Sequence, residues 1–310
     1  MAVSAHDELL WDSPDAERPV LSRPVLVAAF EGWNDAGDAA SLAARHLSER
    51  WGARRFASID PEQFFDFSST RPTVAQVGSS REITWPSNEF LAGRTPLGRD
   101  VIVVLGTEPQ LRWRTFCSLV IEVAQWANVE MVLTLGALLA DVPHSRPVRV
   151  TGTAGDPGLI ARLGLERSRY EGPTGIVGVI HDALRSAGVP SASIWGAVPH
   201  YLPGTPSPKV ALALVQRAAE LLDSSVSTID LEIASAEYER QVNEVVESDE
   251  DMIRYVRQLE ESHDEGDDDD DDTEDGPDVV ANGSLTDEYG NLPTGEALAA
   301  ELERFLRDQG

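Results

Sequence analysis

Apolar residues are grouped along this chain in short continuous runs that alternate with stretches of helical periodicity. Four runs have the length of buried strands, at residues 25–30, 100–105, 131–135 and 191–198. Runs without polar alternation are typical of strands covered on both faces of a sheet. Apolar residues three or four positions apart predict helices at 35–51, 112–128, 176–184 and 208–222. The alternation of strands and helices predicts an α/β fold with a mainly parallel or mixed sheet.

Shorter patterns complete this prediction. Residues 54–59 and 148–152 read as strands, and residues 74–77 could pair with 81–86 as a hairpin. Asp156-Pro157 is expected to start a short helix that ends at Leu163.

Changes in composition divide the chain into four parts. Residues 1–22 form a polar N-terminal arm, and residues 23–225 form the α/β domain. Residues 226–263 are helical in pattern and highly charged, which predicts a helical extension lying on the domain. Residues 264–310 are acidic and are expected to be mostly disordered, because so little apolar surface cannot offset the entropy of ordering.

Charge and cysteine content exclude several classes of function. The formal net charge is −28, from 53 acidic and 25 basic residues, so nucleic acid and anionic membranes are not expected as partners. No stretch is long enough for a membrane span, and the first ten residues lack a basic, apolar signal pattern, so we expect a cytoplasmic protein. A single cysteine, Cys117, and the absence of a histidine metal motif predict neither a metal site nor a cofactor.

Carboxylates follow the buried strands, where open α/β sheets form their ligand crevices. They are Glu31 with Asp35 and Asp38, then Glu108, then Asp141. If they converge, a carboxylate pair could perform acid–base chemistry. Alternatively, Asp35 caps a helix, Asp38 supports its first turn, and Glu31 pairs with an arginine. We favour the second interpretation.

Two further loops could join the same rim. Gly172-Pro-Thr-Gly-Ile-Val-Gly178 precedes a helix, so its amides could hold an anion, although the glycines could equally serve only to allow a tight helix start. His144 and His200 each follow a proline in loops after buried strands, and both could contribute to a site.

Five motifs taken together resemble the proteasome assembly chaperone 2 family, in its actinobacterial branch. They are Phe30-Glu-Gly-Trp-Asn-Asp-Ala-Gly37, Gly106-Thr-Glu-Pro109, Pro143-His-Ser-Arg-Pro147, Gly172-Pro-Thr-Gly-Ile-Val-Gly178 and Val198-Pro-His-Tyr-Leu-Pro203. The resemblance covers about residues 24–223. It implies a three-layer fold similar to purine nucleoside phosphorylases, and a homo-oligomer with a trimer favoured.

The resemblance also implies what this chain binds. Eukaryotic members of the family help to assemble the proteasome core particle, and some members dock through a C-terminal hydrophobic–Tyr–any motif. This chain ends Arg307-Asp-Gln-Gly310, so docking by that route is not expected.

We therefore expect a non-enzymatic, chaperone-like module that binds protein partners, including proteasome-related ones. The alternative is a protein or enzyme that binds a nucleoside-like small molecule at the Glu31 and Glu108 loops. That alternative requires a phosphate-binding arginine, and Arg112, Arg114 and Arg146 are the candidates. The expected ligand or partner rim consists of Glu31, Trp33, Asn34, Asp35, Thr107, Glu108, His144, Arg146, Thr174, His200 and Tyr201. A loop with Phe64, Phe65 and Phe67 is the candidate subunit interface.

Overall fold

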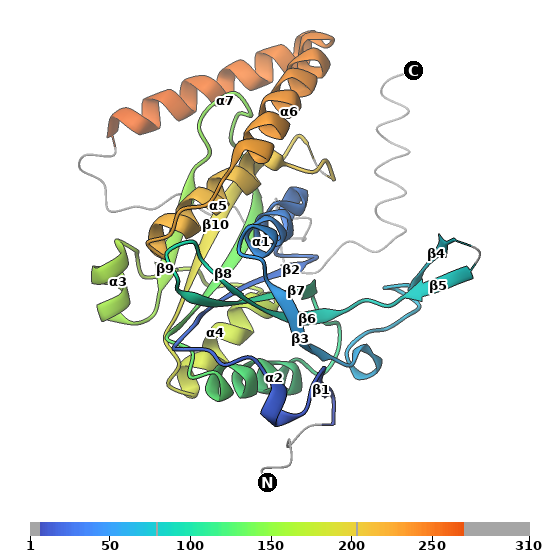
Figure 1. Cartoon of the computed structure of the whole chain (residues 1–310). Coiled ribbons are helices and arrows are strands. Elements are labelled where there is room, and N and C mark those ends of the chain that lie inside the picture. The colour runs from blue at the N-terminus through green and yellow to red at the C-terminus, as the bar shows by residue number, and fades with distance from the viewer. Residues whose placement is uncertain (1–6, 79, 203, 270–310) are drawn as a thin grey trace. The chain divides into compact units, whose positions relative to one another are not determined.

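The computed structural model describes residues 7–78, 80–202 and 204–269, and its centre is an eight-stranded mixed sheet (Figure 1). The strand order is β1-β3-β6-β7-β2-β8-β10-β9. These strands are β1 (Leu9–Trp11), β2 (Val25–Glu31), β3 (Arg54–Ile59), β6 (Asn88–Arg94), β7 (Asp100–Thr107), β8 (Met131–Ala140), β9 (Val150–Ala154) and β10 (Ser191–Pro199). A separate hairpin consists of β4 (Thr73–Val77) and β5 (Ser80–Thr84).

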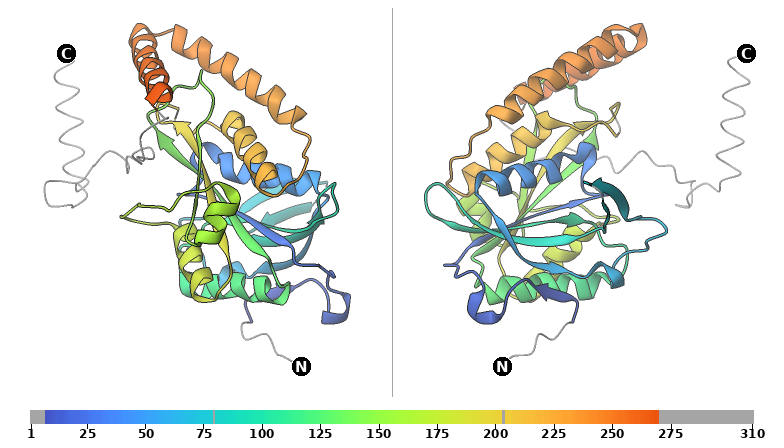
Figure 2. Two further views of the ribbon diagram at one scale, coloured as in Figure 1. Left: turned by 90° about the vertical axis from the view of Figure 1, so that its left-hand side faces the viewer. Right: turned by 45° about the vertical axis from the view of Figure 1, so that its right-hand side comes forward.

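Helices cover both faces of the sheet (Figures 1 and 2). They are α1 (Ala39–Arg50), α2 (Trp113–Trp126), α3 (Pro157–Leu163), α4 (Ile176–Ser186), α5 (Pro208–Leu221), α6 (Ile229–Glu247) and α7 (Glu250–Asp269). None of the helices in the described part of the chain is long and apolar enough to cross a membrane.

The parallel centre of the sheet explains the continuous apolar runs. Strands β7, β2, β8 and β10 are parallel neighbours, and successive side chains of β2 point to opposite faces. Val25 and Val27 belong to one core cluster with α1 and α5, while Leu26 and Phe30 belong to the other with α2 and α4. The α/β fold with helices on both faces of a mixed sheet is therefore confirmed. The likeness to purine nucleoside phosphorylases stays a prediction.

Three details of the sheet differ from the sequence prediction. Strand β6 was not expected, because Glu89 and Gly93 interrupt its apolar pattern, yet it pairs antiparallel with both β3 and β7. Strands β8 and β10 continue past their expected ends, to Ala140 and Pro199, because they pair with each other along their whole length. Part of the N-terminal arm is an edge strand, since β1 pairs with β3.

The aromatic loop is part of the core. Phe64 and Phe65 are 0% and 4% exposed, and the Phe64 ring packs edge-on against Phe116 of α2. The expectation that these two rings form a subunit interface is therefore wrong. Both rings belong to the core cluster that includes residues of α2 and α4. Only Phe67 is partly exposed, with its ring 4.8 Å from that of Trp85.

The helical extension is a pair of helices, α6 and α7, that packs through α6 against α5 (Figure 2). Helix α7 runs to Asp269, so the expectation that disorder begins at residue 264 is wrong for residues 264–269. An ion pair from Arg146 to Asp264 holds this part of the helix. The rest of the expected acidic tail, including Arg307-Asp-Gln-Gly310, lies outside the described residues.

Candidate functional site

Glu108 is the centre of the first half of the expected rim. It follows β7, next to the end of β2, because the two strands are parallel and in register. Its Oε1 accepts the Ile176 backbone N–H at 2.7 Å and the Asn34 side-chain amide at 3.0 Å. Its own N–H donates to the Glu31 carbonyl at 2.8 Å. The carboxylate therefore joins the two strand-end loops and occupies the N-terminus of α4, where it is favoured by the helix dipole.

Close backbone approach makes this arrangement possible. A Cβ atom placed on Gly175 would lie 2.3 Å from the Asn34 amide nitrogen, so only glycine fits beside that side chain. Gly32 has a φ of +122°, a conformation that glycine adopts readily, and its Cα faces Glu108. Gly175 of the 172–178 loop thus allows the close approach of Asn34 at the start of α4.

Asp35 behaves as a helix cap. Its Oδ1 accepts the backbone N–H groups of Ala40 at 2.7 Å and Ser41 at 3.1 Å, at the start of α1. The side chain is buried, and the loss of hydration raises the pKa of its carboxyl group, with the nearby charge of Asp38 adding to the shift. The preferred interpretation of Asp35 therefore agrees with the structure.

Glu31 and Trp33 form the exposed part of this half of the rim. Glu31 pairs with Arg45 of α1 at 3.0 Å and accepts the Thr107 hydroxyl at 3.3 Å. Trp33 is 59% exposed although it lies beside buried Asn34, and Thr174 is exposed as well. An exposed tryptophan held by a rigid loop is typical of a surface that anchors a protein partner.

The second half of the expected rim lies under the helical extension. The Tyr201 hydroxyl accepts the His144 backbone N–H at 2.8 Å and donates to Nδ1 of the same residue at 2.7 Å. Nε2 of His144 therefore carries the proton and donates to Oδ1 of Asn243 in α6 at 2.9 Å. Burial raises the pKa of Tyr201 to about 12, so its hydroxyl keeps the proton that this network needs.

Helix α7 completes this contact. Arg146 makes a two-pronged ion pair with Asp264, with both N–O distances 2.7 Å. His200 lies 2.9 Å from Asp141 and 3.3 Å from the hydroxyl of Tyr255. Arg146 and His200 therefore contact α7, while Glu108 and Asn34 of the first half of the rim contact α4 and each other.

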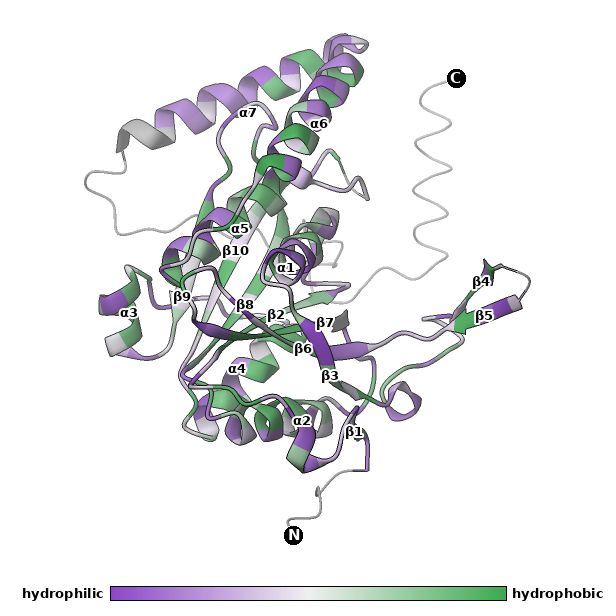
Figure 3. Cartoon of the chain, in the orientation of Figure 1, coloured by the Kyte–Doolittle hydropathy of each residue, from purple (hydrophilic) through white to green (hydrophobic). Residues whose placement is uncertain are grey.

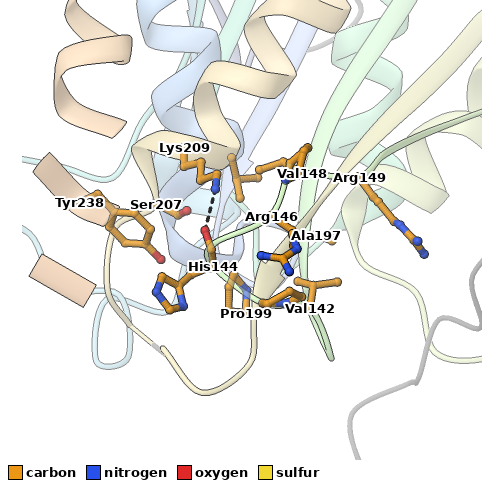
Figure 4. A pocket seen from close by; sticks show the side chains of 13 residues that line it. Val142, His144, Arg146, Val148, Arg149, Ala197, Pro199, Ser207, Lys209 and Tyr238 are labelled. Atoms are coloured by element: carbon orange, nitrogen blue, oxygen red, sulfur yellow. Dashed lines mark hydrogen bonds between the residues drawn. The ribbon is translucent and has the colours of Figure 1, made fainter. Parts of the chain in front are cut away.

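A small cavity lies beneath the His144 loop, lined in part by Ser207, Lys209 and Tyr238 (Figure 4). Figure 4 shows Lys209 reaching the His144 carbonyl, which it contacts at 2.6 Å. The cavity measures about 10 Å³, the space of a single water molecule. It is too small for a metabolite.

The cation beside this half of the rim is Arg45, which pairs with Glu31. Two of the three arginines considered for a phosphate are engaged by other parts of the chain. Arg112 pairs with Glu8 at 2.9 Å and lies over the Phe64 ring, and Arg146 pairs with α7. No cluster of three or more metal-binding side chains occurs within residues 7–78, 80–202 and 204–269.

Sequence reasoning missed the residues of the extension that hold the rim. Asn243 is 99 positions from His144 in the sequence, and Tyr255 is 55 positions from His200. Contacts over such separations leave no local pattern in the sequence.

Comparison with known proteins gives the family context. The profile of the PAC2 family matches residues 29–246. A PAC2 family protein from Streptomyces avermitilis is 45% identical, with a TM-score of 0.71, and the match covers 75% of this chain and 99% of that one. A proteasome-assembly chaperone homologue from Mycobacterium tuberculosis is 44% identical, with a TM-score of 0.68 and the same coverage.

A more distant structure shares the fold. An archaeal proteasome activator from Pyrococcus furiosus is 19% identical, with a TM-score of 0.61, over 77% of this chain and 99% of that one. A search of curated proteins gives no match.

Proposed function

The chain belongs to the PAC2 family, and from this premise we propose that it is a cytoplasmic, non-enzymatic chaperone-like protein that binds another protein through the Trp33 rim. We define the Trp33 rim as Glu31, Trp33, Thr107 and Thr174. Proteasome subunits are the first partners to test, because one 44% identical relative is described as a proteasome-assembly chaperone homologue.

One observation carries the proposal: the Glu108 carboxylate fills the N-terminus of α4 while Trp33 beside it is 59% exposed. A phosphate at this helix end would have to displace a carboxylate that already accepts two hydrogen bonds. The anion site that the amides of the 172–178 loop could form is therefore filled by a carboxylate of the chain itself, which supports the proposal over the nucleoside alternative. The exposed chemistry that is left is the Trp33 indole beside a Glu31 carboxylate paired with Arg45, which fits a partner offering an apolar pocket.

The experiment is direct binding of the full chain to purified proteasome α subunits and to the assembled core particle. Trp33→Ala should weaken binding at least tenfold, the loss typical of a central aromatic anchor. The control is Leu97→Ala, a substitution at an apolar residue on the β6–β7 turn that is 70% exposed, more than Trp33. Equal binding by both variants would contradict the role of the rim, and no binding by the unaltered chain would exclude these partners.

The nucleoside alternative is tested on the same proteins. A panel of nucleosides with inorganic phosphate should leave the melting temperature of the chain unchanged. A rise in melting temperature that Glu108→Gln removes would favour the alternative and contradict the proposal.

The proposal includes self-association, with a trimer as the state that the family resemblance favours. Of the three phenylalanines in the aromatic loop, Phe67 is the one partly exposed and so the one able to contribute. Light scattering at micromolar protein that reports a 33.7 kDa species would contradict self-association.

A further inference from the structure

A two-stranded hairpin projects from the α/β domain without support from the main sheet. We call residues 68–78 and 80–86 the hairpin arm. Its strands β4 and β5 pair only with each other, and all their residues are exposed. Figures 1 and 2 show the arm extending away from the eight-stranded sheet. Two strands alone are marginally stable in water, so such an arm gains stability from a further strand.

The arm carries both hydrophobic and hydrophilic residues (Figure 3), and the register places Val74 and Ile83 on the same face as Gln76 and Arg81. Val74 and Ile83 are directly opposite each other in the ladder and are 56% and 57% exposed. Trp85, just beyond the end of β5, is 46% exposed, and its ring lies 4.8 Å from that of Phe67. The two apolar side chains of this face are therefore exposed without cover from the rest of the described chain.

The two edges of the arm differ in charge. Strand β5 carries Arg81 and Glu82, and charged side chains on an edge strand hinder pairing with another strand. Strand β4 reads Thr-Val-Ala-Gln-Val and carries no charge, so its edge is unprotected.

Charge also selects the occupant of that edge. The chain has a net charge of −28, so two copies repel each other over much of their surface. Residues 67–81 contain no carboxylate and include Arg71 and Arg81. Two copies can therefore meet along β4 without bringing carboxylates together.

We propose that β4 pairs antiparallel with β4 of a second copy of this chain, about a two-fold axis that passes beside Ala75. This register pairs all five residues of the strand and places Val74 of each copy opposite Gln76 of the other. The result is a four-stranded ribbon with the order β5-β4-β4-β5, in which the charged β5 strands form the outer edges. A two-fold contact uses the same surface on both copies, which a strand centred on a small neutral residue allows.

This contact does not depend on the partner proposed above. It is also compatible with the trimer proposed above. The β4 contact would join two single chains, or one chain of a trimer to one chain of another trimer.

The first test is disulfide formation in the full chain carrying Ala75→Cys. At the two-fold axis the two introduced thiols lie within the short Cα separation that a disulfide requires. Mild oxidation should give a covalent species of twice 33.7 kDa in high yield. The native Cys117 does not interfere, because it is buried and its pKa is raised to about 12.

The matched control is Glu82→Cys. Glu82 is the cross-strand neighbour of Ala75 and is equally exposed, but it lies on the outer strand of the proposed ribbon. We expect little or no covalent dimer from it. Equal yields from the two variants, or no dimer from Ala75→Cys, would overturn the proposal.

A second test uses charge and does not depend on oxidation. Ala75→Glu and Ala75→Lys each place like charges opposite each other at the axis, so each variant alone should lose the two-fold contact in sedimentation. A one-to-one mixture places Glu opposite Lys and should restore it. Failure of the mixture to associate more than either variant alone would contradict the register.

Discussion

His181 makes the stability of this protein depend on pH in a way that can be calculated. The side chain extends from α4 to the sheet, where Nε2 contacts the Thr134 hydroxyl at 2.8 Å and Nδ1 contacts the Ser191 hydroxyl at 2.9 Å. Desolvation lowers the pKa of His181 from its ordinary value of 6.5 to about 4, because the charged ring would lose its hydration.

The sign follows from which state binds the proton. Above pH 6.5 the ring is neutral in both the folded and the unfolded chain, so His181 causes no difference there. Between 6.5 and 4 the unfolded chain takes up a proton that the folded chain does not, so the free energy of unfolding falls as pH falls. The two pKa values imply a loss of about 2 kcal/mol at pH 5 and about 3.4 kcal/mol once the folded state is also protonated.

The assay is urea unfolding of the full chain at pH 7.5 and pH 5, compared with the His181→Gln variant. Glutamine does not titrate, so the stability of the variant should fall by about 2 kcal/mol less between the two pH values. If His181→Gln loses as much stability as the unaltered chain, His181 is not the group responsible and the reasoning fails.

Three further predictions concern contacts of the rim and the core. Glu108→Ala should lower the free energy of unfolding by about 2 kcal/mol, because two donors lose a charged acceptor, and Glu108→Gln should cost less; urea unfolding measures both. Arg146→Ala should speed hydrogen exchange in α7, because it removes the ion pair to Asp264, while the free energy of unfolding of the whole chain changes by less than about 1 kcal/mol. Arg254→Ala removes an ion pair within α7 and should leave the exchange rate of α7 unchanged. Phe64→Ala should cost about 3–5 kcal/mol, since the ring is fully buried, and calorimetry showing a loss no larger than that of Phe67→Ala would contradict its place in the core.

Local sequence patterns correctly predicted those features that depend on neighbouring residues in the chain. The continuous runs of β2 and β7 indicated strands covered on both faces, and the loops that follow them do meet at one edge through Glu108 and Asn34. Asp156 caps α3 as its position before Pro157 suggested. These features depend on neighbours in the sequence and on the shared direction of parallel strands.

The sequence by itself determined the alternation of strands and helices, the carboxyl-edge position of the Glu31 and Glu108 loops, and the acidic composition. Tertiary structure alone decided that the expected rim is divided, with His144 turned to α6 and Glu108 to α4. It also decided that Phe64 is a core residue and that β6 is a strand, despite its polar pattern. The reason is physical: periodicity records how much of a side chain is buried, but the identity of the atoms that bury it depends on segments far apart in the chain.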